Sequence, residues 1–579
     1  MTSDTIKPDS LRARLAHVPQ ELRFGTSGRR GPVVHLTQLE IYLNVLAELE
    51  YLQSLPMAAG GIRRGEEFFY AYDLRPSSSC YVEAQQGRGE LAQAAEAAIR
   101  AAGMTPVNLG RIPTPALAHY AWARGKGSLM VTGSHIPFDR NGYKLNTARG
   151  ELLKHHEAPI DAQVRLVRAR LYDQPFAASP FDEQGRFKSG HRALVEENPA
   201  AAVAYQRRYR DFFGSGALAG MRLLVYQHSA VGRDLLPQIL GELGARVETT
   251  GRSDTFVPID TENIDAEQLA IIQSLYQDAA ARYGRFDAVV STDGDSDRPL
   301  LLGVDPASSA LRFFSGDLVG MVAAEYLGAD AVVVPISCND AIDRGPLKPL
   351  LEPKTRIGSP YVIAAMEAAR ARGKRAVCGF EANGGFLTGS DIARDGRVLA
   401  ALPTRDAVLP LVAVLCAARE RGLALTELFS RLPQRFGRAA LLRPFPRPLG
   451  VRLVEHWQPA DPDLQEAQFQ PQGVVALDGA GRPRPLTEAL RRSLTAIREE
   501  LGEFFSPSLG FGAITALNYV DGLRIRFDNG DVAHLRPSGN ADELRIYAVA
   551  DNQARADAIA ALGVAEPDGI LRRLAERVG

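Results

Sequence analysis

Three aspartates, Asp293, Asp295 and Asp297, alternate with small residues in DGDSDR, directly after the apolar run FDAVVST. Carboxylate oxygens at this density suit a hard divalent cation, and Mg²⁺ fits when phosphate oxygens complete its shell. Calcium loops of the helix–loop–helix type also open with alternating aspartates, but they need a glutamate at the twelfth position, where this chain has Val304. A solvated Asp-rich turn is the alternative. The spacing favours a metal site.

A serine and a histidine stand together in TGSHIPFDRNGYK, at the end of another apolar run. Ser134 is a candidate nucleophile, although a serine in such a place is usually a turn or N-cap residue. His135 could act as its base, but adjacent side chains on an extended segment point in opposite directions. No G-x-S-x-G sequence occurs, so a Ser-His-Asp triad is not supported. Near a divalent metal, the oxygen or the phosphate of Ser134 becomes a plausible participant.

Two further loops combine glycines with polar side chains. FGTSGRRGPV carries Arg29 and Arg30, whose guanidinium groups and nearby backbone amides could hold an anion. A plain turn with solvated arginines is an equal alternative. FEANGG places Glu381 and Asn383 before paired glycines, which suits neighbouring sugar hydroxyls. Considered alone, that loop is better explained as an acidic turn after a strand.

A fifth loop, HLRPSGNADELRIY, lies between two strand-like runs. Its arginine, hydroxyl, amide side chain and flexible backbone amides could together hold a phosphate. The residues concerned are Arg536, Ser538, Gly539 and Asn540. A charged β-turn explains the same residues equally well.

Composition narrows the class of protein. A chain of 579 residues exceeds what one hydrophobic core usually supports, so three to five domains are expected. With 67 basic and 68 acidic residues, neither nucleic acid nor an anionic membrane is indicated as a partner. The four cysteines are far apart and form no zinc or disulfide pattern. The N-terminus lacks a signal-peptide core, and the longest apolar stretch, AVLPLVAVLCAA, suits a buried helix rather than a membrane span. These features predict a cytoplasmic protein.

The elements that position these loops are predicted to alternate between strand and helix. The strand-like runs FFYAYDL, RLLVY, FDAVVS, AVVVPIS and RAVCGF indicate parallel α/β domains through the first three quarters. An Ala-rich helix is expected over residues 75–103, ending at Gly103. Residues 173–200 are a polar connection, and 441–487 are rich in proline and glutamine. A helix near 487–503 and the runs LRIRF and LRIYAVA then predict a smaller α+β domain with an antiparallel sheet.

Taken in order, these loops resemble the motifs of the α-D-phosphohexomutase family, which includes phosphoglucomutases and phosphomannomutases. The family's G-T-S-G-x-R-G, T-A-S-H-N-P…N-G-x-K, D-G-D-G-D-R, G-E-x-S-G-H and R-P-S-G-T-E-P motifs correspond to residues 25–31, 132–144, 293–298, 380–385 and 536–542. YDLRPSS and RIPTPAL resemble its connecting motifs. The resemblance extends from residue 24 to about 547, and five motifs in order are far more specific than one.

The resemblance implies four domains around a central cleft: three related α/β modules and a smaller C-terminal α+β domain. The expected boundaries are 1–205 with the phosphoserine loop, 206–312 with the metal loop, 313–435 with the sugar-recognition loop and 436–579 with a phosphate-binding lid.

It also implies a Mg²⁺-dependent phosphohexomutase that interconverts hexose 1- and 6-phosphates. Ser134 would carry the phosphoryl group, a hexose 1,6-bisphosphate would serve as intermediate and activator, and the three aspartates with Ser134 would hold Mg²⁺. The implied catalytic residues around the phosphoserine are Ser134, Lys144, Arg30, Arg298 and, in a supporting role, His135. The implied substrate-binding residues are Glu381, Asn383, Gly358, Ser359 and Tyr361 for the sugar, and Arg536, Ser538, Gly539 and Asn540 for the non-reacting phosphate. The partner is a small sugar phosphate, and no oligomeric state is predicted.

This chain departs from the family motifs at several positions. Gly133 stands for alanine, Ile136 for asparagine, Asn383 for serine, Gly385 for histidine and Asn540 for threonine. The third-domain specificity loop, near RIGSPYVI, also differs from the common glucose and glucose/mannose versions. We therefore expect a phosphomannomutase first and a phosphoglucomutase second. A non-catalytic sugar-phosphate-binding regulatory protein on the same scaffold and a simple phosphatase are the remaining alternatives.

Overall fold

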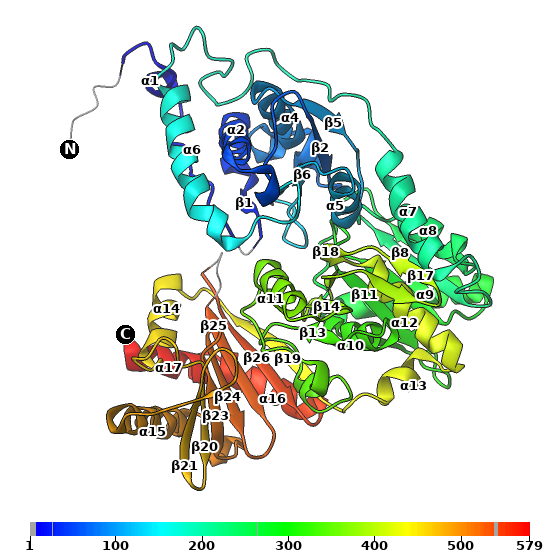
Figure 1. Ribbon diagram of the computed structural model, residues 1–579, viewed down its shortest axis with the longest axis vertical. Coiled ribbons are helices and arrows are strands. Elements are labelled where there is room, and N and C mark those ends of the chain that lie inside the picture. Colours follow the sequence, from blue (N-terminus) through cyan, green and yellow to red (C-terminus); the bar gives the residue numbers. More distant parts are fainter. Residues whose placement is uncertain (1–6, 26, 263, 538–541) are drawn as a thin grey trace. The chain divides into compact units, whose positions relative to one another are not determined.

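The computed structural model describes residues 7–25, 27–262, 264–537 and 542–579 (Figure 1). The chain forms two compact units: unit 1 comprises Met1–Gly328 and Asn383–Thr426, and unit 2 comprises Ala329–Ala382 and Glu427–Gly579. Within these units, we retain the four-domain division as a proposal. Among the described residues, no helix is both long enough and apolar enough to cross a membrane.

The first sheet of unit 1 carries the predicted phosphoserine loop. Its strands follow the order β1-β7-β6-β2-β5, with β2 parallel to β5 and β6, and β7 antiparallel to β6 and β1. Helices α4 and α5 both contact β2 and lie on opposite sides of it in Figure 1. The elements are β1 (Arg29–Pro32), α2 (Gln38–Ser54), β2 (Glu67–Tyr72), α4 (Leu91–Ala101), β5 (Thr105–Asn108), α5 (Thr114–Trp122), β6 (Ser128–Val131), β7 (Arg140–Asn146) and α6 (Glu157–Tyr172).

Two expectations for this region are wrong in part. Only the second half of 75–103 is a continuous helix, because Gly87 and Gly89 adopt positive φ values and break the chain before α4. Gly103, at φ +74°, follows the end of α4 as predicted. Residues 173–200 are more than a polar connection, since the buried rings of Phe181 and Phe187 stack at 4.9 Å within the core of this module.

The second sheet of unit 1 carries the predicted metal loop. Its order is β12-β11-β10-β8-β9, and β8 is parallel to both β9 and β10, whereas β10 and β11 form an antiparallel pair. Both strands predicted from RLLVY and FDAVVS are confirmed. The elements are α7 (Ala200–Phe213), β8 (Arg222–His228), α8 (Leu235–Glu242), β9 (Arg246–Arg252), α9 (Ala266–Tyr283), β10 (Ala288–Thr292), β11 (Pro299–Val304) and β12 (Leu311–Phe314).

Unit 1 also contains part of the third region of the chain. The apolar stretch from Ala407 forms a buried helix, as predicted, and Asp406 just before it accepts hydrogen bonds from the hydroxyls of Tyr205 (2.7 Å) and Tyr209 (2.5 Å) of α7. The elements are α10 (Gly316–Tyr326), β15 (Phe386–Thr388), β16 (Ile392–Arg394), β17 (Arg397–Leu399), β18 (Leu402–Asp406) and α12 (Val408–Arg421).

Unit 2 combines a parallel strand pair with a large antiparallel sheet. Strands β13 (Ala331–Val333) and β14 (Val377–Phe380) are parallel, and α11 (Ser359–Ala371) contacts both. The antiparallel sheet has the order β19-β26-β25-β24-β23-β20-β21-β22, so the predicted C-terminal α+β fold is confirmed. Its strands are β19 (Phe436–Leu442), β20 (Glu466–Gln470), β21 (Gly473–Leu477), β22 (Pro483–Arg484), β23 (Ile514–Asn518), β24 (Leu523–Phe527), β25 (Val532–Pro537) and β26 (Leu544–Ala550).

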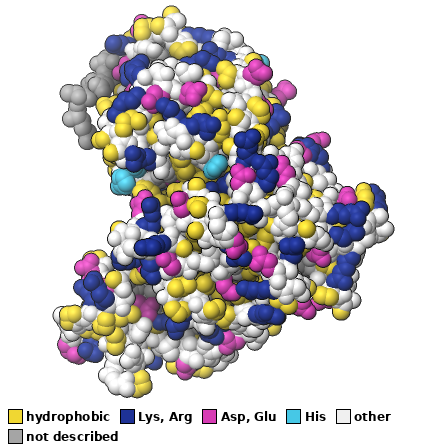
Figure 2. All heavy atoms as spheres, turned by 45° about the vertical axis from the view of Figure 1, so that its right-hand side comes forward, with side chains coloured by type: hydrophobic (Ala, Val, Ile, Leu, Met, Phe, Trp, Pro, Cys, Tyr) yellow, Lys and Arg dark blue, Asp and Glu magenta, His cyan; other side chains and the backbone are white. Residues whose placement is uncertain are grey.

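The stretch 441–487 is therefore structured despite its composition. It supplies α14 (Arg447–His456), β20 and β21, and the side chain of Trp457 lies fully buried in the core of the C-terminal region. The remaining helices are α15 (Glu488–Phe504), which confirms the helix expected near 487–503, α16 (Gln553–Val564) and α17 (Ile570–Val578). Figure 2 shows basic and acidic side chains interspersed over the visible face, in keeping with a formal net charge of -1.

Candidate active site

The three aspartates of the metal loop meet in one buried cluster of unit 1. The loop connects β10 to β11, and one carboxylate oxygen from each aspartate lies within 4.8 Å of the others. The backbone amides of Asp297 and Arg298 donate to Asp293 Oδ1 at 3.1 and 3.2 Å, which folds the loop around that carboxylate. The structure thus brings together Asp293, Asp295 and Asp297 as the sequence pattern predicted.

The cluster fits a divalent cation. Asp295 Oδ1 and Asp297 Oδ1 are buried and accept no hydrogen bond from the described residues. Arg298 Nε lies 3.5 Å from Asp297 Oδ1, beyond good hydrogen-bond distance. A buried charged oxygen that accepts no hydrogen bond is costly, and an oxygen-binding cation reduces that cost. Burial, and secondarily the charges of Asp295 and Asp297, raises the pKa of Asp293 well above its ordinary value. A cation at this position would favour the ionised carboxylate.

Ser134 lies against this cluster although 159 positions separate it from Asp293. It follows β6 with φ +56°, in the left-handed region, and its amide donates to Thr132 Oγ1 at 2.8 Å. Its buried hydroxyl donates to Asp293 Oδ2 at 2.9 Å. A non-glycine residue in that backbone conformation is uncommon and occurs preferentially at functional sites. The local fold therefore aims the serine oxygen at the aspartates.

The expectation that Ser134 and His135 point apart is wrong. Their Oγ and Nδ1 atoms lie 3.5 Å apart, because the left-handed conformation of Ser134 interrupts the extended segment. However, Arg298 Nη1 lies 2.8 Å from the same Nδ1. A guanidinium group can only donate, so this ring nitrogen accepts and its lone pair is used. In this geometry His135 is held by Arg298 and is not the base for Ser134.

The serine loop is held by Arg75 and Asp73, which the sequence analysis did not single out although both stand in YDLRPSS. Arg75 is fully buried, packs 4.0 Å from the ring centroid of Phe256, and its Nε lies 3.3 Å from Asp73 Oδ2. Asp73 Oδ2 also accepts from Thr132 Oγ1 at 2.8 Å. The guanidinium group donates to four loop carbonyls, those of Ser134 (2.8 Å), Ile136, Pro137 (2.7 Å) and Arg140 (3.1 Å).

This arrangement explains one departure from the family motif. A Cβ atom on Gly133 would lie 2.6 Å from Arg75 Nε and 2.7 Å from its Cζ. The glycine therefore leaves room for the arginine beneath the serine loop. Nothing in the structure explains Ile136.

Positively charged side chains surround the aspartates. Lys144 Nζ, from β7, donates at 2.7 Å to Asp295 Oδ2 and at 2.7 Å to Asp297 Oδ2. Arg30 lies on β1. Burial, and then the nearby charges of Arg298 and Arg405, lower its pKa to about 10, so its side chain stays charged at neutral pH. Two further residues contact the cluster and were not among the predicted site residues. Thr114 Oγ1 donates to Asp295 Oδ2 at 2.8 Å, and Arg405 Nε donates to Asp297 Oδ2 at 3.0 Å. Thr114 stands in RIPTPAL, but Arg405 belongs to no motif.

Asn383 shapes its own turn in unit 1. Its Oδ1 accepts from the amide of Gly385 at 3.0 Å, and its carbonyl accepts from Thr261 Oγ1 at 2.8 Å. One side-chain oxygen predicted for the sugar is therefore engaged within the loop.

The other predicted substrate residues lie in unit 2. Gly358, at φ +127°, precedes α11, and Ser359 is buried in the first turn of that helix. Glu381 is buried after β14. Arg536 Nε donates to Asp521 Oδ1 at 3.1 Å near the end of β25. Ser538, Gly539 and Asn540 lie outside the described residues.

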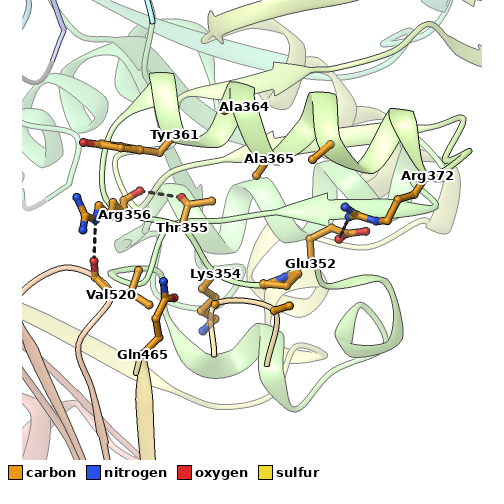
Figure 3. Close-up of a pocket in the computed structure, with 14 residues that line it drawn as sticks. Glu352, Lys354, Thr355, Arg356, Tyr361, Ala364, Ala365, Arg372, Gln465 and Val520 are labelled. Atoms are coloured by element: carbon orange, nitrogen blue, oxygen red, sulfur yellow. Dashed lines mark hydrogen bonds and ion pairs between the residues drawn. The ribbon is translucent and has the colours of Figure 1, made fainter. Parts of the chain in front are cut away.

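The predicted specificity segment lines a cavity of about 750 Å³ in unit 2. Figure 3 shows Tyr361 and Arg356 at one end of this pocket and Arg372 with Glu352 at the other. Arg356 Nε donates to the carbonyl of Val520 at 3.1 Å. Ala364 and Ala365 of α11 lie between the two ends, and Ala368 also lines the pocket.

Comparisons with known proteins identify the family of this chain. The family model described as "Phosphoglucomutase/phosphomannomutase, alpha/beta/alpha domain I" matches residues 21–168, and that of domain III matches residues 315–436. A phosphomannomutase of Sinorhizobium fredii is 36% identical over 94% of this chain and 98% of its own, and one of Salmonella muenchen is 35% identical over 92% of both chains. A solved phosphoglucomutase/phosphomannomutase family protein from Burkholderia thailandensis shares the fold, with a TM-score of 0.61, 17% identity and coverage of 96% and 97% of the two chains.

Proposed function

Because this chain belongs to the phosphoglucomutase/phosphomannomutase family and is an isomerase of the phosphotransferase type, we propose that it interconverts mannose 1-phosphate and mannose 6-phosphate. The observation that carries the proposal is the 2.9 Å hydrogen bond from Ser134 Oγ to Asp293 Oδ2, at a buried, oxygen-only cation site. The two relatives named phosphomannomutase favour mannose. Glucose phosphate is the second candidate substrate, since the family description names both sugars.

The proposed reaction uses Ser134 as a phosphoryl carrier. The bond between phosphorus and Ser134 Oγ breaks as a bond forms to O1 or O6 of the hexose phosphate. The sugar hydroxyl loses its proton and Ser134 Oγ takes up one, so that the serine hydroxyl is restored. The product is a hexose 1,6-bisphosphate, and transfer of its other phosphoryl group restores the phosphoserine. Net transfer thus moves phosphate between O1 and O6.

The surrounding residues are proposed to position and neutralise the phosphoryl group, which is the main requirement of this chemistry. Asp293, Asp295, Asp297 and Ser134 would hold Mg²⁺, which when bound supplies positive charge to the phosphoryl oxygens. Lys144, Arg30 and Arg298 add fixed positive charge around the same point. His135 keeps a supporting role through Arg298.

The sugar and the remote phosphate are proposed to bind residues of the remaining loops. These are Glu381, Asn383, Gly358, Ser359 and Tyr361 for the sugar, and Arg536, Ser538, Gly539 and Asn540 for the phosphate. A remote anchor lets binding energy orient the reacting end of the sugar. A cytoplasmic location also remains a proposal, supported by four cysteines that form no disulfide.

The decisive experiment is a mutase assay with Mg²⁺ and a hexose 1,6-bisphosphate activator on mannose, glucose, glucosamine and N-acetylglucosamine phosphates. We expect turnover of mannose phosphate and a single phosphate on Ser134 by peptide mass spectrometry. Ser134→Ala should abolish both, whereas the exposed control Ser308→Ala should keep both. Turnover that survives in Ser134→Ala would exclude the serine. Sugar-phosphate binding without turnover or phosphoserine would instead support the non-catalytic alternative.

A further inference from the structure

Gly385 and Arg405 compete for the same space in unit 1. A Cβ atom on Gly385 would lie 2.3 Å from Cδ and 2.5 Å from Cγ of Arg405. These atoms belong to the stem of the side chain, whose far end is anchored on Asp297, so the arginine cannot easily move aside. Arg405 thus occupies the direction in which a side chain at position 385 would extend, and the family motif has histidine at that position.

The guanidinium group of Arg405 reaches the centre of the candidate site. The residue is 3% exposed, and its Nε and Nη2 atoms both lie 3.0 Å from Asp297 Oδ2. Lys144 Nζ donates to that same oxygen. Arg405 and Lys144 therefore share one carboxylate oxygen of the metal loop. Arg405 belongs to β18 and to none of the family motifs.

Charge explains what such a group could bind. Four cations, Arg30, Lys144, Arg298 and Arg405, lie around the three carboxylates of the metal loop, and a bound divalent cation would add further positive charge. The Nε of Arg30 is buried and donates no hydrogen bond to the described residues. Like charges confined away from water repel strongly unless an anion joins them. A phosphate anion would stabilise this group of positive charges, and a guanidinium group matches phosphate oxygens through its planar array of donors.

We propose that Arg405 is a phosphoryl-binding residue that occupies the place of the family's histidine, and that Gly385 is required to make room for it. The proposal rests on the mutase function and extends it to a residue of this chain outside the family motifs. Because arginine stays charged at all relevant pH values, it contributes fixed positive charge and does not exchange protons with the sugar. Its ligand is the phosphoryl group rather than a neutral sugar hydroxyl.

Binding measurements with two ligands distinguish an Arg405 that binds the phosphoryl group from one that binds a sugar hydroxyl. Calorimetric titration of the full-length protein with inorganic phosphate and with mannose 6-phosphate should show Arg405→Ala weakening both by roughly 10- to 100-fold, the usual loss for a charge-assisted hydrogen bond. Arg405→Lys, which restores the charge without the planar donors, should recover part of the loss. Repeating the titrations in an Arg536→Ala background removes the proposed remote anchor. Weakening of mannose 6-phosphate alone would overturn the assignment to the phosphoryl group.

A double-mutant cycle tests the role of Gly385. Gly385→Ala should displace Arg405 and weaken inorganic phosphate binding about as much as Arg405→Ala does. The double variant should be no weaker than Arg405→Ala, because the clash exists only while the arginine is present. Gly216→Ala, at a position with nothing within 4 Å of the added Cβ, is the matched control. Additive losses would overturn the link between the two residues.

Different results would refute the proposed mutase function and the proposed role of Arg405. If the unaltered protein has no mutase activity and no phosphate on Ser134, the mutase function fails. If the unaltered protein is active but Arg405→Ala binds inorganic phosphate as tightly and is phosphorylated on Ser134 as fast, only the inference about Arg405 fails.

Discussion

Arg75 holds the serine loop from beneath, and its removal is the most informative perturbation of the site. The side chain donates to four backbone carbonyls of the loop and pairs with Asp73 at 3.3 Å, both side chains being 0% exposed. Arg75→Ala leaves these carbonyls without their donor and the carboxylate of Asp73 buried without its countercharge. Breaking a buried ion pair by removing one partner costs about 3–5 kcal/mol.

The cost is expected to appear as local opening of the loop. The lower figure of about 3 kcal/mol corresponds to a population of the open loop raised on the order of 100-fold. Amide hydrogen exchange across residues 132–136 should therefore accelerate by roughly that factor, since exchange follows the open population. The amide of Ser134, which donates to Thr132 Oγ1, reports directly on the loop. Turnover should fall with it, because the serine oxygen loses its fixed orientation toward Asp293.

Two further variants make the result interpretable. Arg75→Lys keeps a positive charge but not the fork of donors, so exchange should be intermediate. Arg100→Ala removes an arginine whose side chain is 54% exposed and paired with Glu96, so it should change stability by less than about 1 kcal/mol. If Arg75→Ala folds and its loop amides exchange within threefold of the unaltered rate, the arginine does not hold the loop and the argument is refuted.

Three other outcomes are expected. Burial lowers the pKa of His228 to about 4 from its ordinary 6.5, so between these pH values only the unfolded chain takes up the proton. Stability should therefore fall as the pH drops through this window, by about 2 kcal/mol at pH 5 in urea unfolding, and less in His228→Asn. Thr114→Val removes the 2.8 Å hydrogen bond to Asp295 and should raise the Mg²⁺ concentration for half-maximal activity roughly 10-fold. Tyr205→Phe leaves the buried Asp406 with one hydroxyl donor fewer and should lower the free energy of unfolding by about 1.5–3 kcal/mol in the same urea assay.

Sequence patterns predict the parts of the site that are local. Apolar runs define strands such as β8 and β10, and the three aspartates are neighbours in the chain, so their cluster needs no tertiary information. No sequence pattern predicts the left-handed backbone conformation of Ser134, because residues other than glycine rarely adopt it. Arg405 reaches Asp297 across 108 positions as a single residue without periodicity. Only packing of the folded chain reveals such a contact.

Two departures from the family motifs acquire a physical meaning from those packed contacts. Gly133 leaves space for Arg75 under the serine loop, and Gly385 leaves space for Arg405 beside the metal loop. In each case the missing side chain is matched by a buried arginine that contacts the catalytic loops. Beside both replacements, Ser134 still donates to Asp293 at 2.9 Å and the three aspartates still cluster. The departures that first suggested a non-catalytic protein therefore argue for a mutase whose phosphoryl site is built with different side chains.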